Sequence, residues 1–285
     1  MKAVLEHIPS ASESCFASFR RRTRRFNCSY HYHPEVELTL IRSGSGHRLI
    51  GDNLASFGPG DLVLIGANLP HSYFPGPDSQ NGHKDAEAVV VQFPTGMAGG
   101  FLFQAPECRG IVKLLQRAER GLHFSPSGRA ALDENLGAIS DLNGPQRLAR
   151  LLEILGELAD SRAIPLSSGG FTPSLNVAQA ERLERGCRWI ADNFRSPITL
   201  GDVSRHVHMT PPAFSRFFRL ATNRTFVHFV NELRVGYACR LLLESSRTVT
   251  EVAFESGFEN LSNFNRRFRA LRGRTPKEFR NLGKR

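Results

Sequence analysis

Two kinds of hydrophobic pattern divide the chain. Between residues 30 and 93 the apolar residues fall in short runs, such as VELTLIRS and AEAVVVQF, separated by turns that contain glycine or proline. Short apolar runs predict β-strands, and several strands joined by tight turns predict a barrel or jelly roll. After residue 106 the apolar positions recur every three or four residues, the spacing of one face of an α-helix. The pattern therefore predicts an α+β protein of two domains, with an all-α domain at the end.

The middle of the chain carries the first helical pattern. Helices are predicted over 106–121, over 130–142 and from Pro145 onward, and the third has leucines at 148, 151, 152, 155 and 158. This stripe either joins two copies of the chain or packs against the chain's own strands. Residues 163–176 are rich in Gly, Ser and Pro and predict a linker. The expected parts are thus a β-rich domain (1–105), a helical dimerisation or packing region (106–162), the linker, and a helical domain (177–285).

The stretch Thr248–Pro276, TVTEVAFESGFENLSNFNRRFRALRGRTP, predicts two short helices around a tight turn. Thr248 and Glu251 have the spacing of a capping box, and Gly257 suits the left-handed turn that ends the first helix. In the second helix, from about Asn260 to Leu271, the apolar residues recur at helical spacing and leave a polar, basic face. This is the pattern of a helix-turn-helix.

An internal repeat places a second helix-turn-helix before the first. Thr199 and Asp202 form another capping box, and a helix is predicted after Thr210-Pro211-Pro212. At an offset of 50 the chain matches itself at five positions: Phe214, Arg216, Phe218, Thr225 and Phe229 against Phe264, Arg266, Phe268, Thr275 and Phe279. Residues 226–244 predict an amphipathic helix that joins the two units. At a separation of about 34 Å, two recognition helices enter successive major grooves of DNA.

The positive charge of the chain is confined to this repeated segment. The formal net charge is +10; residues 176–285 hold 20 Lys/Arg against 10 Asp/Glu, whereas the rest of the chain holds 17 of each. Such asymmetry suits a polyphosphate partner. Five scattered cysteines without a C-x-x-C pair argue against a disulfide frame and a cysteine zinc site. No apolar run reaches membrane-span length and the first residues lack the apolar core of a signal peptide, so we expect a cytoplasmic protein.

The repeated segment resembles the C-terminal signature of the AraC family of bacterial transcription regulators. The matching residues are Ala253, Gly257, Phe258, Phe264, Arg266, Phe268, Gly273, Thr275 and Pro276. The resemblance implies a sequence-specific regulator rather than an enzyme, with a ligand-sensing N-terminal barrel. It also implies a homodimer joined through a middle helix, with promoter DNA as partner and RNA polymerase as a further one. By family analogy the effector is a sugar or sugar acid.

The family's base-reading positions carry over to both predicted recognition helices. They are Pro212, Ser215 and Arg216 in the first, and Leu261, Ser262, Asn263, Asn265 and Arg266 in the second. Arginine can donate two hydrogen bonds to guanine, whereas Pro212 and Leu261 would make only apolar contacts. Arg219 and Arg269 are expected to hold phosphates. For any one arginine the alternative is an ordinary exposed surface charge.

The segment His31-Tyr32-His33-Pro34-Glu35-Val36-Glu37 carries the other candidate chemistry. Residues two apart in a strand face the same way, so His31, His33 and Glu37, with Glu35, are expected to share a face, and His71 follows an adjacent strand. Three imidazoles and a carboxylate suit a divalent transition metal. The spacing H-x-H-x3-E-x6-G resembles the first cupin motif, and Pro70-His71 resembles the end of the second.

Two departures weaken the cupin resemblance: Arg25 replaces the leading glycine, and Gly66-Ala67-Asn68 replaces P-x-G. The four side chains therefore line an effector pocket without a cofactor, bind a metal for sensing, or are structural. Tyr32, His47 and Tyr73 are further polar candidates for the pocket. The basic cluster within 16–25 predicts a strand that runs into a solvated loop, or else a DNA-contacting arm or an anion site.

The function that these observations predict is a DNA-binding regulator controlled by a small molecule in a cupin-like barrel. The alternatives are a metal-dependent cupin enzyme with an accessory DNA-binding module, and a constitutive DNA-binding protein whose barrel has lost its ligand.

Overall fold

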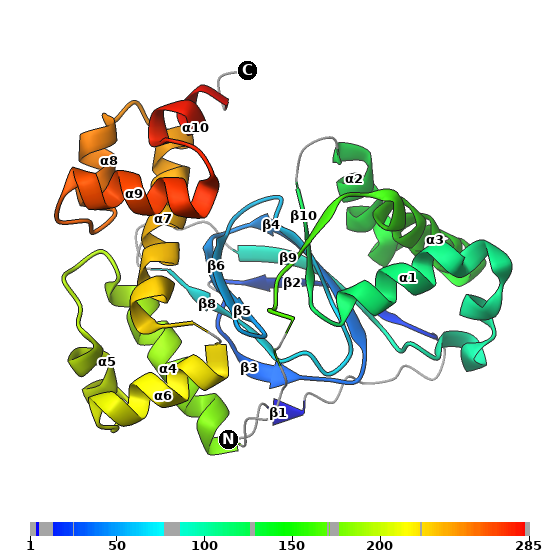
Figure 1. Ribbon diagram of the computed structural model, residues 1–285. Coiled ribbons are helices and arrows are strands. Elements are labelled where there is room, and N and C mark those ends of the chain that lie inside the picture. Colours follow the sequence, from blue (N-terminus) through cyan, green and yellow to red (C-terminus); the bar gives the residue numbers. More distant parts are fainter. Residues whose placement is uncertain are drawn as a thin grey trace. The chain divides into compact units, whose positions relative to one another are not determined.

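The computed structural model of the protein describes residues 4–5, 14–24, 26–76, 86–125, 129–169, 171, 177–222 and 224–282. The chain divides into two compact units. One holds the described residues up to Ala180 except Leu54–Ser56, and the other holds those three residues and the chain from Glu181. Strands and three α-helices make up most of the first unit, and the part of the second unit from Glu181 is helical (Figure 1). The predicted α+β class, with a β-rich domain first and a helical domain last, is confirmed.

Two sheets form the β-rich part. The five-stranded sheet has the order β1 (Val4–Leu5), β3 (Cys28–Tyr32), β8 (His71–Pro75), β5 (Gly46–Ile50) and β6 (Asn53–Phe57). The six-stranded sheet has the order β11 (Ala163–Pro165), β10 (Leu122–Phe124), β7 (Leu62–Ile65), β4 (Val36–Ser43), β9 (Ala86–Phe93) and β2 (Ala17–Thr23). Strand β4 pairs antiparallel with both β7 and β9, which places Glu37 directly opposite Gln92.

Alternation along β4 explains why its apolar run is nearly continuous. Leu38 and Leu40 belong to a core cluster with residues of α1 (Arg109–Ala118), α2 (Ala130–Ala138) and α3 (Gly144–Asp160). Ile41 belongs instead to a cluster with Tyr73 of the other sheet. One face of the six-stranded sheet is therefore covered by helices (Figure 1), and the other faces the barrel interior. A strand buried on both faces needs few exposed polar positions.

The middle helices lie near their predicted bounds, but their leucine stripe packs inward. Leu151, Leu155 and Leu158 of α3 are fully buried in the core cluster of their own unit. Of the two possibilities left open by the sequence, the structure shows packing against the chain's own strands. These three residues cannot also form a dimer seam without leaving that core.

The predicted linker differs from the structure over its first residues. Ala163–Pro165 form β11, an edge strand that pairs with β10. The backbone N–H of Leu166 donates to Gly121 O at 2.9 Å, and that of Ser167 donates to Arg120 O at 2.8 Å. Proline is tolerated on an edge strand, where its missing N–H faces away from the ladder. Residues 170 and 172–176 lie outside the described residues.

The helical unit contains α4 (Val177–Asn193), α5 (Leu200–His206), α6 (Pro211–Thr222), α7 (Phe226–Glu244), α8 (Val249–Glu255), α9 (Leu261–Arg272) and α10 (Pro276–Leu282). Both predicted capping boxes are present, at the starts of α5 and α8. Gly257, in the turn between α8 and α9, has a φ of +86°. The final helix α10 had no separate prediction.

The internal repeat extends from the backbone to the side chains. Phe218 packs edge-on against Phe229 with ring centroids 4.9 Å apart, and Phe268 packs in the same way against Phe279 at 5.6 Å. Each second member lies one turn after a threonine cap, Thr225 in one case and Thr275 in the other. Helix α7 lies between the two units along the chain and packs against α6, α8, α9 and α10. Phe218, Phe229 and Phe268 are buried core residues, as their helical spacing predicts, and Phe279 is half-buried.

Candidate functional site

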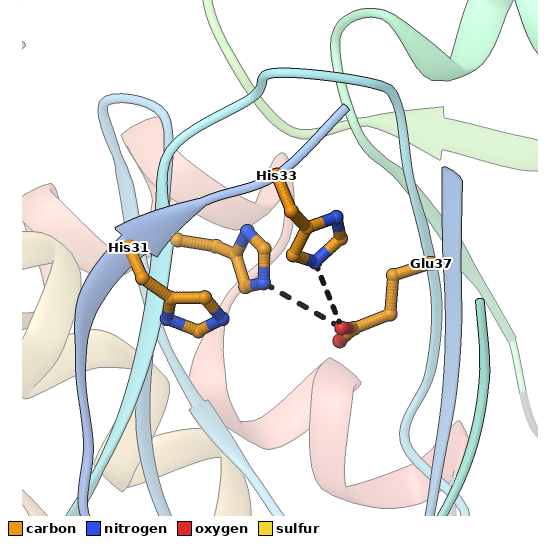
Figure 2. A group of neighbouring side chains, drawn as sticks. His31, His33 and Glu37 are labelled. Atoms are coloured by element: carbon orange, nitrogen blue, oxygen red, sulfur yellow. Dashed lines mark hydrogen bonds and ion pairs between the residues drawn. The ribbon is translucent and has the colours of Figure 1, made fainter. Parts of the chain in front are cut away.

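Four side chains converge inside the barrel: His31, His33, Glu37 and His71. Figure 2 labels the first three. All four are buried, and their ligand-type atoms lie within 4.8 Å of one another. His31 and His71 are directly opposite in the β3–β8 ladder, with ring centroids 4.1 Å apart. Strand pairing thus brings together the residues that sequence alternation and the cupin-like spacing singled out.

Backbone carbonyls fix two of the imidazoles. Nδ1 of His33 lies 3.1 Å from Glu35 O, and Nδ1 of His71 lies 2.9 Å from Leu69 O. A carbonyl oxygen only accepts, so each Nδ1 carries a proton and donates. Each Nε2 then faces the Glu37 carboxylate, at 3.2 Å for His33 and 3.7 Å for His71.

The carboxylate is itself held by two donors. The Thr39 hydroxyl donates to Glu37 Oε1 at 2.7 Å, and Gln92 Nε2 donates to Oε2 at 2.8 Å. Sequence reasoning missed both, although Thr39 shares the inward face of β4 and Gln92 is the single polar residue among the last five of β9. Together they leave Glu37 with a fixed orientation toward the imidazoles.

The electrostatics of the cluster require a positive charge next to Glu37. Burial works to raise the pKa of Glu37, but the His71 and His33 imidazoles outweigh burial and hold that pKa well below its usual value. Burial likewise works to lower the pKa of His33, and the hydrogen bond and charge of Glu37 raise it overall. At His33, a neutral Nε2 would place its lone pair 3.2 Å from a carboxylate oxygen, and a proton or a metal ion between the two atoms would stabilise this arrangement.

The four residues also fit the ligand set of a divalent metal. Metal–nitrogen and metal–oxygen bonds of about 2.0–2.2 Å place ligand atoms on opposite sides of an ion about 4.0–4.4 Å apart. The observed spread of at most 4.8 Å needs only a small contraction. Nδ1–H donation to a carbonyl is the usual support for a ligating histidine.

A cavity that is open to solvent lies next to this cluster. His31 and Glu37 border it, and His33 and His71 do not. The remaining polar lining residues are Arg21, Asn27, Cys28, Thr39, Tyr73 and Gln92, and the apolar ones are Phe19, Phe26, Ile41, Ala88 and Val90. The cavity therefore has a polar end at Glu37 and an apolar wall formed by strands of both sheets.

Some of the residues expected at the site lie elsewhere. Glu35 is outside the cluster because the turn after β3 breaks the strand alternation. Its carboxylate lies 3.6 Å from Nδ1 of His33, on the side of the ring away from Glu37. Tyr73 borders the cavity, whereas Tyr32 and His47 are not among its lining residues. His47 is buried with its ring centroid 5.9 Å from that of Phe74.

The basic cluster of β2 divides into three separate contacts. Arg20 pairs with Asp141 at 2.7 Å, and Arg22 pairs with Glu87 at 2.9 Å. Arg21 lies between them in sequence and points to the other face, where it borders the cavity and contacts Cys28. The predicted strand is present, but it runs through all three arginines, so this part of the basic cluster lies in the strand and not in a solvated loop. Arg25 lies outside the described residues.

A buried ionic group escaped prediction. Arg48 Nε lies 2.9 Å from Asp61 Oδ2, and His123 Nε2 lies 3.0 Å from Asp61 Oδ1. Burial works to raise the pKa of Asp61, but Arg48 and His123 together lower it to about 2. The three residues come from three segments far apart in sequence, so no local pattern signals them.

The second candidate site is the outer face of α6 and α9. Pro212, Ser215, Arg216 and Arg219 are exposed on α6, and Ser262, Asn265, Arg266 and Arg269 are exposed on α9. Leu261 and Asn263 are half-buried. Arg266 donates to the side-chain oxygen of Asn263 at 3.1 Å. The residues predicted to contact DNA therefore form two similar solvent-facing surfaces, and their role stays a prediction.

Comparison with known proteins gives matches at both ends of the chain. A family model described as an AraC-like ligand binding domain matches residues 16–102, and one described as a helix-turn-helix domain matches residues 203–282. The HTH-type transcriptional activator RhaS of Pectobacterium carotovorum is 22% identical over 265 residues, which cover 88% of this chain and 86% of RhaS.

Two solved structures match different shares of the chain. The DNA-binding domain of the transcriptional factor AdpA, in complex with a target DNA, is 26% identical, with a TM-score of 0.34; the match covers 35% of this chain and 91% of that one. ToxT of Vibrio cholerae, bound to a naphthalenyl-butenoic acid, is 13% identical, with a TM-score of 0.36; the match covers 95% of this chain and 100% of ToxT. Among the described residues, no helix has the length and apolar character needed to cross a membrane.

Proposed function

Because the chain belongs to the AraC family of transcription regulators, we propose that it binds promoter DNA sequence-specifically under the control of a small molecule bound in the barrel. The observation that carries this proposal is the pairing of two features in one chain. One is a duplicated helix-turn-helix with two exposed polar helix faces; the other is a barrel cavity with a buried polar end.

The DNA-binding half of the proposal rests on shape and charge. Helix α7 has 19 residues, about 28 Å at 1.5 Å per residue, which is comparable to one turn of B-DNA. The base-reading candidates are Pro212, Ser215, Arg216, Leu261, Ser262, Asn263, Asn265 and Arg266. Arg219 and Arg269 are exposed at the ends of the same helices and are the candidates for phosphate contacts. The net charge of +10 falls entirely within this part of the sequence.

The effector half rests on the cavity. A ligand with hydroxyl groups would find acceptors and donors at Glu37, Thr39 and Gln92, which suits the sugar or sugar acid suggested by family analogy. Binding would act by shifting the population between arrangements of the chain that engage DNA and those that do not. We also expect a homodimer with a seam other than the three buried leucines of α3, a cytoplasmic location, and contact with RNA polymerase at the promoter.

A divalent metal ion in the barrel is the second candidate, and the convergence of the imidazole Nε2 atoms on one carboxylate favours it. His31, His33, Glu37 and His71 would hold the ion. When bound, the metal would supply a Lewis-acid contact for an oxygen atom of the effector. Thr39 and Gln92 would keep the Glu37 carboxylate oriented in either case.

The test begins with selection of preferred sites from a random DNA library, using the full chain. Arg216→Ala and Arg266→Ala should each lower affinity for the selected site by about 1–3 kcal/mol and relax the preference at one base position. Arg162→Ala is the matched control, because Arg162 is exposed in the first unit and the charge change is the same. Absence of any sequence preference at physiological salt would refute the proposal.

The effector part of the proposal is tested by a separate experiment. A thermal-shift screen of sugars and sugar acids should yield a ligand that also changes DNA affinity. A His31→Ala/His33→Ala variant should still bind DNA but lose that response. Failure of every compound, with unchanged DNA binding, would favour a constitutive DNA-binding protein. Turnover of a substrate with stoichiometric iron, manganese or zinc would favour the alternative of a cupin enzyme.

A further inference from the structure

Cys28 differs from the other cysteines in its surroundings. All five lie in the described part of the chain and none forms a disulfide; Cys108, Cys187 and Cys239 are buried, and Cys15 is exposed. Cys28 is half-buried, borders the barrel cavity, and has its sulfur 3.0 Å from Nη1 of Arg21. A guanidinium at this distance favours the thiolate, which is the nucleophilic form of cysteine.

A second observation points to a ligand at the same place. Tyr73 is directly opposite Cys28 in the β3–β8 ladder, so the two side chains are neighbours on one face of the sheet. Tyr73 is 6% exposed and borders the cavity, and its hydroxyl has no hydrogen-bond partner among the described residues. An unpaired buried hydroxyl costs free energy, so a ligand atom that accepts from it is favoured.

We propose that Cys28 captures small α,β-unsaturated carbonyl compounds inside the cavity and that the adduct acts as an effector. The Cys28 sulfur adds to the β-carbon, which forms the S–C bond. The π-electron pair of the C=C bond moves onto the carbonyl system as an enolate, and the α-carbon then takes a proton from water. The thiol proton has left to solvent, so the net reaction is an addition without an oxidant or leaving group.

Each neighbour has a distinct part in this addition. Arg21 stabilises the attacking thiolate. The Tyr73 hydroxyl donates to the carbonyl oxygen as negative charge develops there. Phe26, Ile41 and Val90 give the carbon skeleton an apolar wall. A sugar would use the Glu37 end of the cavity and would not need the thiol.

The thiol chemistry is tested with crotonaldehyde on the full chain at pH 7, with borohydride trapping and peptide mass spectrometry. Cys15 is the internal comparison because it is exposed in the same molecule. Cys28 should react at least tenfold faster than Cys15. Arg21→Ala should remove most of that advantage, and Arg21→Lys should retain part of it. Equal rates at the two cysteines, or a Cys28 rate that Arg21→Ala does not change, would overturn the proposal.

Tyr73→Phe separates a donor from a merely structural residue. It should slow the reaction of Cys28 with crotonaldehyde at least threefold but leave the reaction with iodoacetamide unchanged, because no enolate forms in that substitution. Equal slowing of both reagents would refute the donor role.

The signalling part rests on the proposed function and is measured separately. The crotonaldehyde adduct should change affinity for the selected DNA site at least threefold in the parent chain and not in Cys28→Ser. A fast thiol with unchanged DNA affinity would overturn the effector role of the adduct. Unmodified protein that binds no preferred site would instead refute the regulator function, whatever the thiol does.

Discussion

Replacing Gly257 by alanine tests the local geometry on which α9 depends. Gly257 has a φ of +86°, in the left-handed region that an L-residue adopts at a cost of about 1–2 kcal/mol. A Cβ there would lie 2.7 Å from Phe194 O and 2.8 Å from Arg195 O, both backbone atoms that cannot rotate away. Forced repacking of this kind costs about 1–3 kcal/mol, and the loss of glycine's entropy in the unfolded chain returns about 0.4–1 kcal/mol. The expected net loss is about 2–4 kcal/mol.

The assay uses a built-in probe of the helical unit. Trp189 of α4 is the single tryptophan of the chain, and its ring centroid lies 5.9 Å from that of His206. Its emission in urea therefore follows unfolding of this unit without a signal from the barrel. A loss of about 3 kcal/mol should lower the midpoint by about 1.5–2 M for a typical urea slope. DNA affinity should fall with it, because Gly257 sets the direction in which the chain enters α9.

Two other positions in the same unit serve as comparisons for Gly257→Ala. Gly236 lies inside α7 with nothing within 4 Å of an added Cβ, so Gly236→Ala should raise stability by about 0.5–1 kcal/mol. His208 occupies the equivalent of Gly257 at an offset of 49 and has a φ of +55°. His208→Gly should relieve strain and gain about 0.5 kcal/mol after the entropy cost. Gly257→Ala is expected to lower the urea midpoint, and Gly236→Ala is expected to raise it. If Gly257→Ala also raised the midpoint, or changed it by no more than Gly236→Ala does, the argument from backbone geometry would be wrong.

Three further changes test other parts of the structure. The pKa of Asp61 is lowered from 3.8 to about 2, so its ionised form stabilises the fold above pH 4, and this contribution of about 2 kcal/mol is lost as the pH falls to 2. Asp61→Asn should remove that pH dependence and should cost about 3–5 kcal/mol at pH 7, because it leaves Arg48 buried and unpaired. Hydrogen exchange in β4 measures both effects. Arg234 donates to Phe194 O at 2.7 Å and to Ser196 O at 2.9 Å, so Arg234→Ala should destabilise the helical unit by about 2 kcal/mol in the tryptophan assay, and a change below 0.5 kcal/mol would contradict this. If the barrel binds a divalent metal, Glu37→Gln should reduce zinc retained after dialysis, measured by elemental analysis, from about one ion per chain to near zero; equal retention in both proteins would place the metal elsewhere.

Local patterns selected the residues of the barrel cluster but not the geometry that joins them. The cupin-like spacing selected His31, His33 and Glu37, although a turn separates β3 from β4 and alternation does not run through it. Within β4, alternation also predicts that Thr39 shares the face of Glu37. Gln92 lies 55 residues from Glu37, and only the pairing of β4 with β9 brings them together. The cavity contacts of Arg21 depend in the same way on the pairing of β2 with β9. Sheet register is not encoded in any one segment.

In two places the sequence pattern was compatible with more than one structure. The leucines of α3 have the spacing of a seam between chains, but the same spacing suits a helix lying on a sheet, and burial decides between them. His208 was not expected to have a positive φ, because histidine gives no turn signal. The offset that aligns Val203 with Val252 also aligns His208 with Gly257, so the repeat contained that information.

Strand β4 connects the cavity mechanically to the helices on the other face of the sheet. Glu37, Thr39 and Ile41 face the cavity, whereas Leu38 and Leu40 on the same strand pack against α1–α3. A strand cannot move on one face alone, because successive side chains share one backbone. Close packing makes the core behind it resist a gradual shift, so a displacement at Glu37 would favour a discrete rearrangement of the helices. The strand that lines the cavity is therefore also the support of the helices behind it.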